Sequence, residues 1–208
     1  MDSIIKSAEN AMDKYTTYRA LTGRHKLAMK NGFYFEALLI DYAVLEDRLT
    51  SFLWYSGVTP SAETLSLGCS GNKADLERIF IENTDKSKAP KKINSISVKI
   101  ATVRALISFA EKPYDGQSRY SKLLYDALNT IELDKLSETL DGVDRWRGYR
   151  NEVIHAAMKK NVFSLYEELE SNAQLGMDYA RIIDNAVKKL KGRPAIRKSV
   201  KMPSRKDG

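Results

Sequence analysis

The chain of 208 residues has few of the residues that build disulfide frameworks and metal centres. It contains one cysteine, Cys69, and two histidines, His25 and His155. A single cysteine excludes an internal disulfide framework, so a reducing, cytoplasmic location is the default expectation. Cys69 has no neighbouring base, and we interpret it as an incidental loop cysteine. The sequence also lacks metal-ligand clusters, phosphate-binding glycine motifs and serine-triad signatures, so no metal or cofactor is expected.

Long apolar runs are absent as well. Five charged residues interrupt the most apolar window, residues 33–55: Glu36, Asp41, Glu46, Asp47 and Arg48. A membrane-spanning helix needs about 20 mostly apolar residues in succession, so no membrane partner is expected. The first residues carry charges at helical spacing instead of a secretory apolar segment, so no signal peptide is expected. For the run at 46–48 we expect a solvated face or an ion pair, with support of a site as the alternative.

Proline and glycine, with five and eleven residues, are scarce and fall between periodic apolar stretches. Apolar residues recur every three or four positions over 2–21, 33–55, 73–83, 93–110, 118–128, 133–140 and 161–190, which predicts helices. The apolar content of 43% and the charged content of 29% are typical of a soluble globular chain. We therefore expect an all-α fold: an up-and-down antiparallel helical bundle with extra helices, forming one domain over residues 1–190.

Glycine also marks expected breaks in the helices. Gly23 is expected to end the first helix, which would leave His25 in a solvated connector. The pair at 141–142 is expected to interrupt a helix, with Asp141 as the N-cap of the next one. The connector over 84–92 contains four lysines: Lys86, Lys88, Lys91 and Lys92. We expect that connector to be a solvated loop, with contact to a phosphate backbone as the alternative.

Basic charge is concentrated at the C-terminal end. Residues 191–208 contain seven lysines and arginines and one aspartate, a net charge of +6, which leaves +1 of the total of +7 for residues 1–190. The apolar pattern is lost after Pro194, so we expect a disordered basic tail over 191–208. Such a tail could hold nucleic acid through salt-sensitive contacts, or could serve solubility alone.

The strongest functional signal is the stretch Trp146-Arg-Gly-Tyr-Arg-Asn-Glu-Val-Ile-His155. A helix advances about 100° per residue, which places four residues on a core face: Trp146, Tyr149, Val153 and Ala156. A stripe on the other side consists of Arg147, Asn151 and His155. Arg150 lies at the boundary between the two faces. Ile154 and Met158 flank the stripe, and apolar residues on both faces predict a second partner for this helix.

The side chains of His155 and Arg150 suit the cleavage of RNA through its own 2′-hydroxyl. That reaction needs a group that moves protons near neutral pH, which the imidazole of a histidine can do. It also builds negative charge on the phosphate oxygens, which a guanidinium can hold with two hydrogen bonds. Asn151 lies four residues before His155 and could orient the imidazole or contact the phosphate.

The pattern over residues 150–155, an arginine, a polar residue, three further residues and a histidine in a helical stretch, resembles the signature of the HEPN domain family. These are small all-helical bundles, many of which cleave RNA without a metal. The resemblance implies that His155 is the acid and base, that Arg150 clamps the phosphate and that Asn151 aids both. It implies that Arg147 and Tyr149 line the cleft, and that a homodimer forms one cleft from two copies of the motif. Some HEPN toxins carry a tyrosine two residues after the histidine, which a partner nucleotidyltransferase modifies. This chain has Ala157 there, so that regulation is not expected.

The leading hypothesis is therefore a HEPN-like, metal-independent endoribonuclease. It would act on RNA as a toxin, paired with an antitoxin or another protein partner, or as an antiphage or stress effector. The alternative is a non-catalytic HEPN-like module that binds nucleic acid, a nucleotide or a protein. A third interpretation is a helical interaction protein in which the motif is coincidental.

Overall fold

The structure, a computed structural model, describes residues 11–61, 64–116, 118–156, 159 and 168–200. Its helices are α1 (Ala11–Lys30), α2 (Tyr34–Tyr55), α3 (Lys73–Glu82), α4 (Ile96–Glu111), α5 (Arg119–Leu128), α6 (Leu133–Ala156), α8 (Leu169–Lys191) and α9 (Ala195–Ser199). The described residues form no β-strand, and one isolated antiparallel bridge joins Ser66 and Lys92. The predicted all-α bundle is confirmed.

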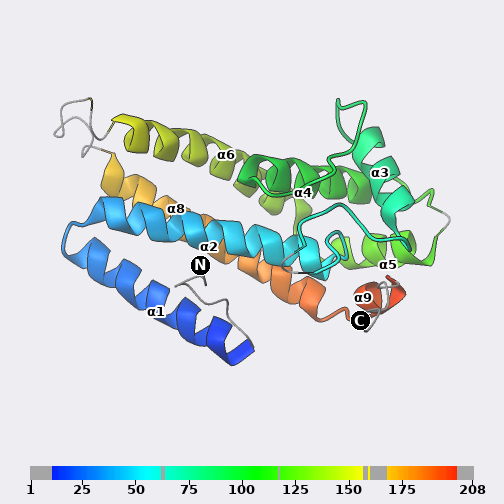
Figure 1. Cartoon of the computed structure of the whole chain (residues 1–208), viewed down its shortest axis with the longest axis horizontal. Coiled ribbons are helices and arrows are strands. Elements are labelled where there is room, and N and C mark those ends of the chain that lie inside the picture. The colour runs from blue at the N-terminus through cyan, green and yellow to red at the C-terminus, as the bar shows by residue number, and fades with distance from the viewer. Residues whose placement is uncertain (1–10, 62–63, 117, 157–158, 160–167, 201–208) are drawn as a thin grey trace, which may run out of the picture.

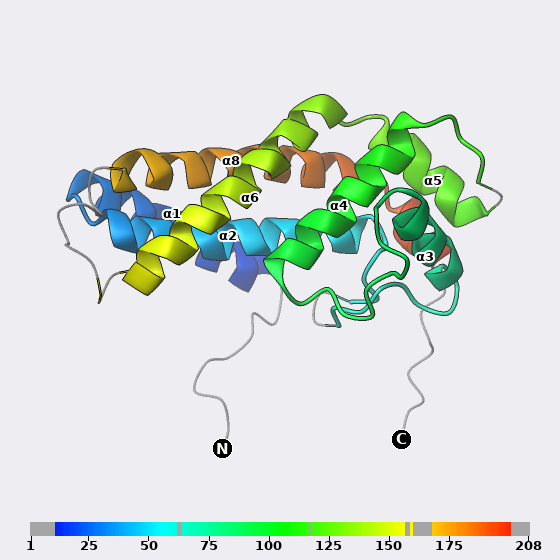
Figure 2. The same cartoon turned by 90° about the horizontal axis from the view of Figure 1, so that it is seen from above.

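Helices α2 and α8 form the centre of the bundle and pack together along their length (Figure 1). They run in the same direction, whereas α1 lies antiparallel to α2, and α6 lies antiparallel to α8. Helix α4 packs against both α2 and α6. Helices α3, α5 and α9 gather at the end of the molecule where α2 terminates, as the view from above also shows (Figure 2). The C-terminal half of α6 lies at the opposite end.

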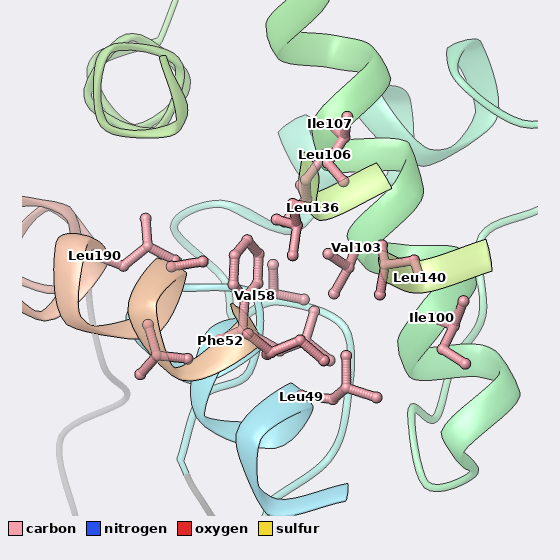
Figure 3. Close-up of a cluster of buried hydrophobic side chains, with 14 of the residues drawn as sticks. Leu49, Phe52, Val58, Ile100, Val103, Leu106, Ile107, Leu136, Leu140 and Leu190 are labelled. Carbon is pink, nitrogen blue, oxygen red and sulfur yellow. The ribbon is translucent and has the colours of Figure 1, made fainter. Parts of the chain in front are cut away.

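The hydrophobic core explains why α2 is central. Its fully buried side chains recur along the whole helix: Leu38, Leu45, Leu49, Phe52 and Leu53. Figure 3 shows part of this cluster, in which Phe52 lies among side chains from α4, α6 and α8. Burying one such side chain is worth about 1.5–3 kcal/mol, so this row fixes α2 in the bundle. The residues that α2 presents to its neighbours are therefore held on a rigid support.

The first helix differs from its prediction. Helix α1 continues through Gly23 to Lys30, and the chain turns at Gly32, whose φ of +73° suits glycine. Gly23 is exposed and has no atom near the place where a Cβ would lie. One glycine costs a helix about 1 kcal/mol, and the packing of His25 and Ala28 beyond it outweighs that cost. Residues 2–10 of the predicted helix lie outside the described residues.

The expected break at 141–142 is also wrong, because α6 runs unbroken from Leu133 to Ala156. Gly142 is buried against Tyr179 of α8, and a Cβ at this position would lie 2.6 Å from the Tyr179 ring. The glycine therefore serves close packing between α6 and α8. Asp141 is not an N-cap, since its carboxylate accepts a hydrogen bond from Arg104 of α4 at 2.6 Å.

The basic tail does not begin at residue 191. Helix α9 follows α8 after a short turn, and Ile196 and Val200 are buried. Arg197 donates hydrogen bonds to the carbonyl oxygens of Thr59 at 2.8 Å and Pro60 at 2.9 Å, which fastens α9 to the loop after α2. The buried side chains and the hydrogen bonds of Arg197 hold this segment in place. Because these contacts involve single residues, the helical periodicity of the sequence does not predict them. Residues 201–208 lie outside the described residues.

The charged run at 46–48 forms ion pairs, as expected. Glu46 accepts a hydrogen bond from Lys99 of α4 at 2.9 Å, and Arg48 donates to Asp184 of α8 at 2.7 Å. The side chain of Lys99 is only 2% exposed, so this pair joins α2 to α4 inside the protein.

Candidate functional site

The two faces predicted for the motif helix are confirmed in α6. Trp146, Val153 and Ala156 are buried. Along the other side, Arg147, Asn151 and Ile154 are half-buried and His155 is exposed. The indole nitrogen of Trp146 donates a hydrogen bond to the carbonyl oxygen of Asn172 in α8 at 2.7 Å. That bond and the buried residues set the rotation of α6 and so the direction of the exposed stripe.

The guanidinium of Arg150 is held in place by a neighbouring helix. Its central carbon lies 4.0 Å from the centre of the Tyr42 ring in α2. One terminal nitrogen, Nη1, donates a hydrogen bond to Oδ1 of Asn151 at 3.1 Å, and Nε is buried without a hydrogen-bond partner within the described residues. A cation over an aromatic face is stabilised by about 0.5–2 kcal/mol. Stacking and one hydrogen bond therefore orient the guanidinium fork.

His155 lies in the last turn of α6, with an exposed side chain. Within the described residues, nothing donates a hydrogen bond to its ring or accepts one from it. It lies five positions after Arg150, which corresponds to roughly 7.5 Å along the helix axis and about 140° around it. Within one chain, the side chains of Arg150 and His155 therefore point in different directions from α6. Asn151 lies between them and contacts Arg150 rather than His155.

The other two predicted site residues have different surroundings. Arg147 donates two hydrogen bonds to Oδ1 of Asp144, at 3.1 and 2.8 Å, so its charge is already paired. It borders a shallow charged hollow that also includes Arg104 and Arg145. Tyr149 packs against the hydrophobic core, and burial raises the pKa of its hydroxyl. Tyr149 therefore lies on the core side of α6, away from the stripe that carries His155.

Sequence reasoning missed a buried ionisable pair between α1 and α2. His25, expected in a solvated connector, is 4% exposed, and Asp41 is fully buried. Nε2 of His25 lies 3.1 Å from Oδ1 of Asp41. None of the atoms Nε2, Oδ1 and Oδ2 forms a well-aligned hydrogen bond within the described residues, so the pair is a close charge contact. The expectation for His25 was wrong because Gly23 does not end α1.

The surroundings of the pair bring α8 and α6 close to it. A Cβ on Gly176 of α8 would lie 2.8 Å from the Cβ of Asp41 and 2.8 Å from Cζ2 of Trp146. Only a glycine lets α8 approach this closely. Asp41 thus contacts the segment that positions Trp146, and the next residue of α2, Tyr42, holds Arg150. The buried pair and the arginine of the motif share one short stretch of α2.

Both members of the buried pair have shifted pKa values. Burial raises the pKa of Asp41 to about 6, and the Asp41 carboxylate raises the pKa of His25 above its usual value. Asp178 and Arg181 of α8 also act on the pair: Asp178 raises the pKa of Asp41, and Arg181 lowers the pKa of both groups. In both cases the folded chain binds protons more tightly than the unfolded chain.

We therefore expect the pair to stabilise the fold less as pH rises. A group whose pKa is raised by folding contributes stability at low pH and loses it as pH passes its folded pKa. The window runs from about pH 4 to 6 for Asp41 and continues above about 6.5 for His25. Urea unfolding of the wild type and of Asp41→Asn at pH 5 and pH 8 measures this. The wild-type advantage in unfolding free energy should be smaller at pH 8. An equal or larger advantage there would contradict the assignment.

The described residues show two further absences. No three side chains of His, Cys, Asp or Glu among them lie close enough together to hold a metal ion. None of the described helices has the length and apolar character needed to cross a membrane.

Comparison with protein-family models, with curated proteins and with solved structures gives no match for this chain. The HEPN resemblance therefore remains a prediction that depends on the motif in α6.

Proposed function

We propose that the chain is a HEPN-like, metal-independent endoribonuclease that cleaves RNA through its 2′-hydroxyl. The observation that supports this most is the placement of Arg150. Its guanidinium is held between Tyr42 and Asn151, at the border of a surface that also carries the exposed His155. Arg150 would bind the phosphate oxygens, and His155 would move the protons. Asn151 would keep the guanidinium oriented toward the substrate.

We propose further that the active form is a homodimer. Arg150 and His155 of one chain point about 140° apart around α6, so groups from two chains are better placed to surround one phosphate. Apolar side chains adjoin this surface: Phe35 and Leu39 of α2, on the same side of that helix as Tyr42, are 37% and 39% exposed. Burial of exposed large apolar residues favours association. A toxin or an antiphage or stress effector, controlled by an antitoxin or another protein, is the biological role that the resemblance suggests.

One observation favours a second candidate function. His155 has no partner in the described residues that would fix its ring, whereas Arg150 is fixed by two neighbours. A fixed guanidinium without an oriented base is what a non-catalytic module for nucleic acid, a nucleotide or a protein would need. The two functions differ in their product, because the module binds RNA without cleaving it.

RNA cleavage in EDTA tests the proposed function. We expect purified wild-type protein to cut RNA in excess EDTA and the double variant Arg150→Ala/His155→Ala, purified in the same way, to leave it intact. Filter binding of the same RNA separates the candidates. Binding that needs Arg150 without any product favours the module. Equal cleavage by the wild type and the double variant would overturn the proposed nuclease activity and the roles given to Arg150 and His155.

A further inference from the structure

A hollow of about 490 Å³ lies beside α3. Helix α3 lies at the end of the molecule opposite to the C-terminal half of α6, the helix that carries His155 (Figures 1 and 2). One wall is a face of α3, where Lys73, Glu77 and Ile81 follow each other at four-residue spacing. The back is the segment 66–68, and the facing wall is the segment 87–91. The volume falls within the range of about 300–1,000 Å³ that is usual for small-molecule sites.

The segment at the back of this hollow is held rigidly. Its last residue, Gly68, has a φ of +67°, and a Cβ at this position would lie 2.8 Å from the Cα of Lys73. Asn72 is buried and joins two neighbouring segments: its side chain accepts a hydrogen bond from the amide of Cys69 at 3.0 Å and donates one to the carbonyl of Gly57 at 2.8 Å. The amide of Ile93 donates to the carbonyl of Leu65 at 2.7 Å. The segments at the back and at the facing wall are therefore tied together without any ligand.

The walls carry an excess of positive charge. Lys73, Lys88 and Lys91 line the hollow, and Glu77 is the acidic residue among the lining side chains. The ammonium of Lys73 lies 3.8 Å from a carboxylate oxygen of Glu77. Lys88 and Lys91 have no ion-pair partner within the described residues and are exposed. The net charge of +2 on the lining predicts an anionic ligand, since ammonium groups bind phosphate as point charges.

The hollow also has an apolar side. Ile81 is 41% exposed, although it belongs to the wall formed by α3, and it faces the segment with Ala89 and Pro90. Leu67 at the back is almost fully buried. The hydroxyls of Ser66 and Ser87 add polar groups at the edge. An exposed isoleucine next to unpaired lysines suits a ligand that has an apolar body and a charged end.

We propose that this hollow binds a small phosphate monoester that carries a flat apolar ring. The ring lies on Ile81, Ala89 and Pro90, and the phosphate lies between Lys88 and Lys91 with Lys73 nearby. The site is separate from Arg150 and His155 and does not depend on the function proposed for them. The same chemical group occurs in free aromatic or nucleoside phosphates and at the 5′ end of a nucleic acid, and the test distinguishes these sources.

Isothermal titration of the whole chain with 1-naphthyl phosphate tests the proposal, with inorganic phosphate titrated in parallel. We expect 1-naphthyl phosphate to bind about tenfold more tightly than inorganic phosphate, because the ring covers apolar surface. Lys88→Glu/Lys91→Glu should weaken its binding at least about tenfold. Lys26→Glu/Lys30→Glu is the matched control: it makes the same charge change at exposed positions of α1, and it should bind like the wild type.

The ring and the source of the phosphate are tested separately. Ile81→Ser should weaken 1-naphthyl phosphate about threefold or more and leave inorganic phosphate unchanged. A 5′-phosphorylated trinucleotide that binds as tightly as 1-naphthyl phosphate would identify a nucleic acid end as the source and would support the site. No binding of 1-naphthyl phosphate, equal loss in the two lysine variants, or equal affinity for inorganic phosphate would overturn the proposal. Circular dichroism of each variant checks that the fold is intact.

Discussion

Asp41→Ala is expected to lower the free energy of unfolding by about 3–5 kcal/mol, which is the usual cost of removing one partner from a buried ion pair. Asp41 is fully buried, and His25 opposite it is 4% exposed. Without the carboxylate, the imidazole stays in a low-dielectric site and loses its anionic partner, and a small cavity forms between α1, α2 and α8. Urea denaturation followed by circular dichroism at pH 6 measures the loss.

Two matched variants separate the charge contact from simple packing. His25→Leu/Asp41→Leu replaces the pair with apolar side chains of similar volume and should be close to the wild type in stability, or above it. Asp85→Ala removes an exposed aspartate and should change the unfolding free energy by less than about 0.5 kcal/mol. If Asp41→Ala costs no more than Asp85→Ala, the buried pair does not hold α1 in place.

His155→Ala is expected to lower the rate of RNA cleavage by about 10²–10⁴, which is the usual contribution of a general acid or base. The side chain is exposed, so its removal should leave the fold intact. Glu138→Ala is the matched control, since Glu138 is also exposed on α6 but lies more than four turns before His155. Initial rates on one labelled RNA measure the effect. Similar rates for the two variants would mean that His155 is not the proton-moving group.

The faces of α6 could be predicted from the sequence because they depend only on the helical period. Trp146, Val153 and Ala156 recur at core spacing, and the structure buries them. The position of Arg150 at the boundary of the faces was predicted for the same reason. Its contact with Tyr42 could not be predicted, because the two residues lie 108 positions apart in the chain. Periodicity shows which side of a helix is covered, and it does not identify the residue on the neighbouring helix.

The buried histidine was missed although the sequence holds a signal for it. Tyr18, Leu21, His25 and Ala28 follow the spacing of one helical stripe, and this stripe is the side of α1 that faces the core. His25 belongs to that stripe only if the helix continues through Gly23, as it does in the structure. A glycine within an otherwise regular helical pattern costs only about 1 kcal/mol, so the regular spacing predicts the extent of α1 better than Gly23 does. Its partner Asp41 lies in the most apolar stretch of the chain, where an acidic residue needs a buried partner.

The hollow beside α3 illustrates what composition and periodicity leave out. Lys88 and Lys91 were expected in a solvated loop, and they are indeed exposed. The bridge between Ser66 and Lys92 holds that loop opposite α3. The hollow is therefore lined by three segments that are separate in the sequence. Such a site depends on pairing between distant segments, which sequence spacing does not reveal.

We propose that His155 moves the proton of the RNA 2′-hydroxyl while Arg150 holds the phosphate that this hydroxyl attacks. It is tested most directly with an RNA oligonucleotide cut by the wild type at a mapped bond and with the same oligonucleotide carrying a single 2′-deoxynucleotide on the 5′ side of that bond. We predict that the ribose substrate yields a product ending in a 2′,3′-cyclic phosphate and that the deoxy substrate is not cut at that bond. Cleavage of the deoxy substrate at an unchanged rate, or a 3′-hydroxyl at the newly cut end of the upstream fragment, would contradict the claim.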